Sequence, residues 1–240
     1  MIYALIGHVP MGHKHAYDNN SKRCKRKNLG LKAEVSCVFV MKKPKVLESL
    51  GLRKDWIYEA IISSYSGTLA HAAPMGISTP DHERLVAEIY KSSRTCANIL
   101  EKKAYAVNLS FDVSLFYDSY NKKESLIYGR AENVEAPILA NADAFLEISV
   151  TGSEDLGDRI RFTGKIAGYS SRREPGEIKL INRGDALALE ALIAISRIPS
   201  ASIEEKESLL REIARICRVV SRVAPGSAAE ECVRVLSSRL

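Results

Sequence analysis

The 240-residue sequence predicts a mainly β domain with one or two helices, followed by a helical domain. Two observations indicate this division. From Trp56 to about residue 180, short runs rich in aromatic and β-branched residues alternate with turn residues, as paired strands do. Beyond Pro175 the composition becomes helical, and apolar residues recur at helical spacing. We therefore expect three segments, at residues 1–40, 41–180 and 181–240.

The first segment, residues 1–40, has no helical or strand periodicity, which predicts a disordered tail. It could equally be an extended translation, because Met41 looks like a natural start. The segment holds seven basic and two acidic side chains, so the rest of the chain is nearly neutral despite a net charge of +6. This distribution argues against nucleic acid as a partner. The histidines and cysteines of the segment match no zinc-binding spacing, and we expect no metal site.

Local patterns predict each element of the β domain. The runs WIYEAIISSY and TLAHAAPMGIS are separated by Ser66 and Gly67, which indicates a hairpin turn. Ser93 is placed to cap a short helix. We expect strands at 56–65, 68–78, 84–92, 104–111, 129–136 and 159–172, and helices at 93–103 and 138–148. Residues 112–129 are mixed in character, and we expect them to include a loop.

The helical domain has clear boundaries. A helix over residues 183–198 should end at Pro199. The next, over residues 202–223, opens with a capping-box pair, Ser202 and Glu205. Its apolar stripe consists of Leu209, Ile213, Ile216 and Val220. A last helix follows Pro225 and Gly226.

Familiar catalytic motifs are absent from the sequence. It contains no GxGxxG after a strand, no GxxxxGK[ST], no HExxH and no GxSxG. Five cysteines without a CxxC pair suit a reducing cytoplasm, and no apolar run is long enough to predict a membrane span. No residue is identified as catalytic. If the protein is an enzyme, we expect a bound cofactor to carry the reaction.

Residues 68–78, TLAHAAPMGIS, are unusual for a strand because they include alanines, a proline and a glycine. Such small residues would let a flat ring lie close to the backbone. The segment KSSRTCANI then places hydroxyls and Arg94 at a helix start, where free N–H groups favour a phosphate. Together they suggest a phosphorylated planar ligand. A bulged edge strand followed by a capped helix would give the same letters.

Four motifs occur in the order found in a known fold: HAAPMG (71–76), SRTCANI (93–99), AVNL (106–109) and INRGDALALEALIAISR (181–197). This order resembles the FMN-binding split-barrel proteins of flavin-reductase type. It is most similar to an uncharacterised, largely archaeal family of that fold. The resemblance implies a split β-barrel before the helical domain, FMN as the cofactor, and a homodimer with FMN near the interface.

The resemblance also implies a set of cofactor-binding residues. Those that would border the isoalloxazine ring are Ser63, Ser64 and the backbone of Ala73, Pro74, Met75 and Gly76. Those that would hold the phosphate are Ser93, Arg94 and Thr95, with Asn98 and Asn108 bonding nearby. Arg183 is a further candidate for the same ligand or for a subunit contact. The chain departs from the family pattern at His71, where Asn is expected, and at the two serines, where threonines are expected.

From this resemblance we expect an FMN-dependent oxidoreductase of flavin-reductase type that uses NAD(P)H. Two alternatives remain open. One is a non-catalytic flavin-binding or partner-binding protein of the same fold. The other keeps the fold but binds deazaflavin or haem.

Overall fold

The computed structural model describes residues 46–238. Its predicted fold class is confirmed: a closed barrel of six antiparallel strands, in the order β1-β2-β3-β8-β7-β4, precedes a group of helices. The barrel strands are β1 (Tyr58–Ser66), β2 (Leu69–Ser78), β3 (Arg84–Tyr90), β4 (Ala104–Leu109), β7 (Ala144–Asp155) and β8 (Arg159–Ser171). The short strands β5 (Tyr128–Arg130) and β6 (Pro137–Leu139) form a separate hairpin. The expected tail, residues 1–40, lies outside the described residues.

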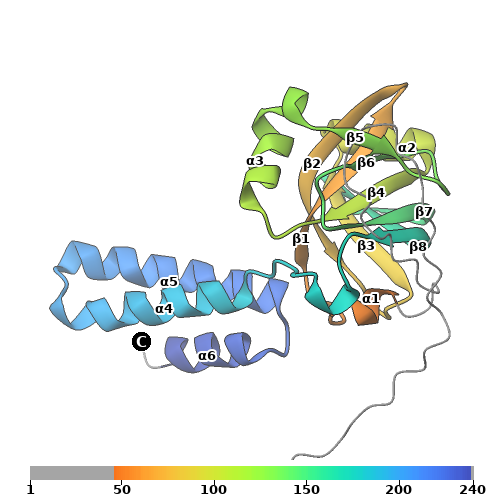
Figure 1. The fold of residues 1–240 in the computed structure, drawn as a ribbon. Coiled ribbons are helices and arrows are strands. Elements are labelled where there is room, and N and C mark those ends of the chain that lie inside the picture. The colour runs from red at the N-terminus through yellow and green to blue at the C-terminus, as the bar shows by residue number, and fades with distance from the viewer. Residues whose placement is uncertain (1–45, 239–240) are drawn as a thin grey trace, which may run out of the picture.

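Helices lie at three places around the barrel (Figure 1). These are α1 (Val46–Ser49), α2 (Arg94–Lys102) and α3 (Val113–Asn121). The chain continues into α4 (Gly184–Arg197), α5 (Ile203–Val223) and α6 (Ala228–Ser237), which pack as a bundle projecting from one side of the barrel. The capping box that the sequence predicts at Ser202 and Glu205 is present. None of the helices in residues 46–238 is long and apolar enough to cross a membrane.

The barrel closes unevenly. β1 pairs with β2 along its whole length, from Tyr58↔Ile77 to Ser66↔Leu69. By contrast, β2 and β3 pair only at Ile77↔Ala87 and Ser78↔Val86. Residues 69–76 of β2 therefore have no strand partner on their second side within the described part of the chain. In an antiparallel strand, alternate residues turn their N–H and C=O groups toward opposite neighbours, so this open edge presents unpaired backbone groups.

Successive β1 residues face opposite sides, as the strand period of two requires. Ala60 and Ile62 lie in the barrel core, which Tyr105 and Phe162 also fill. Ile61, between them, packs outside the barrel in a separate apolar cluster beneath α3 and β6. The two faces of β1 therefore contact different apolar clusters, one inside the barrel and one outside it.

The structure differs from the sequence expectations at three places. Residues 138–148 are not a helix, because residues 144–148 belong to β7, which pairs with β4 on one side and β8 on the other. This long-range pairing outweighs the helical propensity of the alanines. Residues 129–136 form a strand only as far as Arg130 and then turn in a loop. Within the mixed stretch at 112–129, residues 113–121 form a helix that the sequence did not predict, and Asp112 caps it.

The Asn182 side chain is one of the links between the barrel and the bundle. Asn182 donates hydrogen bonds to the carbonyl oxygens of Ile57, before β1, and Val223, at the end of α5, at 2.8 and 2.7 Å. Its own oxygen accepts from the Gly184 N–H at the start of α4. In addition, the indole N–H of Trp56 donates to the Pro225 oxygen. The segment just before β1 is thus bound to the residues that precede α4 and to the turn between α5 and α6.

Candidate functional site

The outer side of β1 carries a closed polar network. The Asn108 amide nitrogen donates to the Ile61 oxygen at 2.9 Å and to the Ser63 hydroxyl at 2.8 Å. Ser63 in turn donates to the Pro137 oxygen at 2.6 Å, and the Leu139 N–H donates to the Asn108 oxygen at 2.7 Å. Ser63 and Asn108 are fully buried. They fasten β6 to the barrel, and their hydrogen-bonding capacity is largely used within the protein.

The adjacent residue, Ser64, faces the other way, toward α2. The Asn98 amide nitrogen donates to the Ser64 hydroxyl at 3.0 Å, and both side chains are buried. Across the β1–β2 hairpin Ser64 pairs with His71. These contacts place the start of α2 beside the open edge of β2.

The first turn of α2 leaves donors free. Ser93 caps the helix: its hydroxyl accepts from the Cys96 N–H at 3.2 Å and donates to the Tyr90 oxygen at 2.7 Å. Within residues 46–238, nothing accepts the backbone N–H groups of Arg94 and Thr95. The Thr95 hydroxyl is also buried without a partner. Buried polar groups are normally paired, so these orphaned groups indicate a ligand, and a helix start favours an anionic one.

Three basic side chains gather at this point, and we refer to His71, Arg94 and Lys123 as the basic cluster. Burial, then the charges of Lys123 and Arg94, lowers the pKa of His71 to about 4, so its imidazole is neutral at pH 7. Burial and the Arg94 charge also lower the pKa of Lys123. No carboxylate among the described residues forms an ion pair with Arg94 or Lys123. The cluster therefore has an uncompensated positive charge.

The open edge of β2 lies on the same strand as His71 of the basic cluster. Ala73, Pro74, Met75 and Gly76 are half-buried there, so their backbone is within reach of a ligand. A Cβ at Gly76 would approach the Ile57 side chain to 2.8 Å, so this position has no room for a side chain. Gly76 therefore makes room for Ile57, whereas the small side chain of Ala73 and the unpaired backbone groups would allow a flat molecule to approach the edge.

The structure thus divides the residues that the resemblance implied. It brings His71, Arg94, Thr95 and the edge of β2 to one region. Ser64 and Asn98 lie beneath that region and position it. Ser63 and Asn108 belong to the closed network on the other side of β1, and their role as ligand contacts stays a prediction.

Arg183 does not belong to the basic cluster, because it forms an ion pair of its own. Its guanidinium pairs with the Glu59 carboxylate at 2.7 Å, next to the bridge between Glu59 and Ile181. This contact lies where the barrel meets α4. Arg183 therefore has a carboxylate partner within the chain, whereas Arg94 and Lys123 have none among the described residues.

Sequence reasoning missed Lys123. It lies in NKKES, between α3 and β5, which as a sequence resembles a solvated loop. Only the packing of α3 against β2 brings this lysine to the start of α2. No local sequence pattern marks Lys123.

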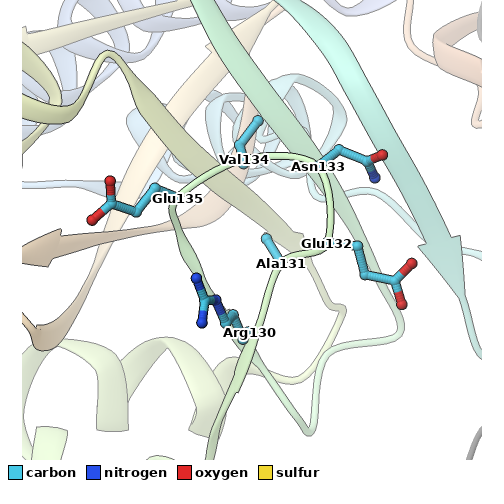
Figure 2. Close-up of a pocket in the computed structure, with 6 residues that line it drawn as sticks. All are labelled: Arg130, Ala131, Glu132, Asn133, Val134 and Glu135. Carbon is cyan, nitrogen blue, oxygen red and sulfur yellow. The ribbon is translucent and has the colours of Figure 1, made fainter.

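A surface hollow lies away from this region. Residues 130–135, which connect β5 to β6, curl around a space of about 420 Å³. Figure 2 shows that the side chains of Arg130, Glu132 and Glu135 point outward from this loop in different directions. Glu135 is bound by Lys102 at 2.8 Å. Because these groups do not converge, the hollow is a poor candidate for a binding site. Within residues 46–238, no three metal-ligating side chains lie together.

Comparison with known families identifies the chain. Residues 58–173 match the model described as "Protein of unknown function (DUF447) N-terminal domain", and residues 182–233 match "Protein of unknown function (DUF447)". The chain belongs to the DUF447 family. The two matches cover the barrel and the helical bundle in turn, and they confirm the uncharacterised family that the sequence resembles.

Solved structures similar to this DUF447 protein include the following three. An FMN-bound DUF447 protein from Methanosarcina mazei is 25% identical, with a TM-score of 0.47, over 81% of this chain and 100% of that one. An FMN-binding protein from Thermus thermophilus with bound 1-cyclohex-2-enone is 15% identical (TM-score 0.45; 52% and 80%). Nitrilotriacetate monooxygenase component B from Mycobacterium thermoresistibile is 18% identical (TM-score 0.43; 52% and 79%).

Proposed function

We propose that this protein binds FMN at the basic cluster and the open edge of β2. The observation that carries the proposal is the gathering of Arg94 and Lys123, without a carboxylate partner in the described chain, at a helix start with free N–H groups. A phosphate monoester has the charge and the acceptor oxygens that this site lacks. The FMN-bound member of the same family supports the same class of ligand here.

The chain's residues suit the two ends of FMN. Arg94 and Lys123 would neutralise the phosphate, and the N–H groups and hydroxyl at the start of α2 would donate to its oxygens. The half-buried backbone from Ala73 to Gly76 would border the isoalloxazine ring. His71, neutral at pH 7, can donate one hydrogen bond without adding charge. Burial of Ser64 and Asn98 keeps α2 fixed against β1.

We further propose that the protein is an oxidoreductase of flavin-reductase type that uses NAD(P)H. Bound FMN supplies hydride acceptance and electron transfer. The protein's own groups bind and orient, and the described site offers no carboxylate placed as an acid or base. This agrees with a reaction in which the cofactor rather than a side chain is the reactive group.

The protein is also proposed to form a homodimer through the face around α3. Phe111, Val113, Tyr117 and Tyr120 are all more than half exposed on or next to this helix. Exposed aromatic residues of this density are typical of an interface. α3 leads directly into Lys123, so the dimer contact would lie near the proposed phosphate site.

The first test is the visible absorbance spectrum of the protein purified without added cofactor, followed by identification of the small molecule released on denaturation. Flavin bands with FMN released are expected. Failure to take up added FMN would overturn the proposal, and release of deazaflavin or haem would replace the ligand. Anaerobic addition of NADPH then tests catalysis: bleaching of the flavin is expected, whereas an unreduced flavin would indicate a non-catalytic flavin-binding protein.

A further inference from the structure

Helix α4 has an apolar face on its outer side. It packs into the bundle through Ala188, Ala191 and Ala194. On the outward side lie Leu189, Leu192 and Ile193, whose exposed fractions are 57%, 44% and 45%. We call these three residues the outer stripe of α4. A helix at the surface of a bundle normally turns charged residues outward, so three half-exposed apolar side chains together are unusual there.

The outer stripe continues onto α6. Leu192 lines a hollow of about 230 Å³ together with Cys232, Val235 and Leu236, and the exposed surface in it is almost wholly apolar. Figure 1 shows that the bundle projects away from the barrel, so this side is not covered by the strands. The apolar patch thus spans two helices and is rimmed by Glu231.

The charges beside the stripe are self-complementary. Glu190 and Arg197 are seven residues apart, so they lie along one flank of α4 about two turns from each other. Both are exposed, and neither forms an ion pair with a described residue. If two copies of α4 packed antiparallel about a two-fold axis near residues 193–194, each Glu190 would face Arg197 of the second copy. The same axis would bring the two Ile193 side chains together.

We propose that the outer stripe of α4 is a self-association surface, on which a second copy of this chain packs with its α4 antiparallel. The contact is isologous, so it contributes two Glu190–Arg197 pairs and buries both stripes. It is distinct from the face around α3. If both contacts form, the assembly in solution is larger than a dimer.

The test measures the mass of the full-length protein in solution by light scattering after gel filtration. Leu189→Glu combined with Ile193→Glu is expected to halve the mass relative to wild type. Leu210→Glu on α5 is the control: it places a glutamate at an exposed leucine outside the stripe and should leave the mass unchanged. An unchanged mass in the double variant would overturn the proposal.

A charge exchange tests the antiparallel arrangement itself. Glu190→Arg and Arg197→Glu, made separately, each replace two attractive pairs by two repulsive ones and should weaken association roughly 10-fold. Mixing the two variants should restore the wild-type mass, because each arginine then faces a glutamate. If the mixture stays dissociated, the stripe is covered in another way and this pairing is wrong. FMN uptake should be the same in all these variants, so the outcome is independent of the proposed flavin site.

Discussion

Ser63 and Ser64 are adjacent in the chain, yet they belong to polar regions of opposite character. On the Ser63 side, Asn108 ties β1, β4 and β6 together, and each of its amide atoms has a partner. On the Ser64 side, the basic cluster and the Thr95 hydroxyl lack such partners within the described residues. A satisfied network stabilises a fold, whereas an unsatisfied one costs stability unless a ligand completes it. The contrast separates a structural site from the proposed binding site.

The largest effect on stability is expected on the Ser63 side. Asn108→Leu removes three hydrogen bonds and leaves the Leu139 N–H buried without an acceptor. We expect the free energy of unfolding to fall by about 3 kcal/mol. Urea denaturation followed by circular dichroism measures it. A loss below roughly 0.5 kcal/mol would contradict the structural role of the network.

The largest effect on affinity is expected on the other side. Arg94→Gln and Lys123→Gln should each weaken FMN binding about 10-fold, and the double variant more, because each removes a charge-assisted contact to the phosphate. Stability should stay the same or rise slightly, since two like charges are no longer held together. Lys122→Gln is the matched control, as Lys122 instead lies over the Tyr117 ring. Fluorescence titration with FMN measures these affinities, and equal values for Lys122→Gln and Lys123→Gln would remove Lys123 from the site.

Protonation of His71 should make the stability of the protein depend on pH. The folded-state pKa of His71 is lowered from 6.5 to about 4, first by burial and then by Lys123 and Arg94. As the pH falls from about 6.5 to about 4, the unfolded chain takes up a proton that the folded chain does not, so stability falls across this window. His71→Gln should flatten that dependence.

A bound phosphate should reverse part of the His71 shift, because a neighbouring anion favours the imidazolium. Titration of the His71 ring signals by NMR, with and without FMN, measures this. An identical pKa in the two states would mean that the anion does not lie near His71.

The smallest effect is expected at Arg183. Its ion pair with Glu59 is partly solvent-exposed, with the Arg183 side chain 44% accessible, so Arg183→Gln should cost less than about 1 kcal/mol. FMN affinity should be unchanged, because this arginine has its own carboxylate partner. A 10-fold loss of FMN affinity would instead return Arg183 to the ligand site.

Local sequence patterns predict much of the fold and part of the candidate site. The hairpin of β1 and β2, the cap at Ser93 and the capping box at Ser202 all depend on neighbouring residues, so their letters suffice. The strand at residues 144–148 depends on partners far along the chain, and there the helical composition is misleading. The site has the same limit. A sequence shows that Asn108 can form hydrogen bonds, but not whether those bonds are already used inside the protein.

Asn182 joins two segments of the chain that the family models treat separately. The family models divide the sequence on either side of residues 174–181. Yet Asn182 and Trp56 bond the approach to β1 to the end of α5 and the residues beyond it. A truncation before this asparagine would strip hydrogen-bond partners from the barrel as well as remove the helices. The two segments should therefore melt in one cooperative calorimetric transition, and a gene cut at this junction should yield no independently stable half.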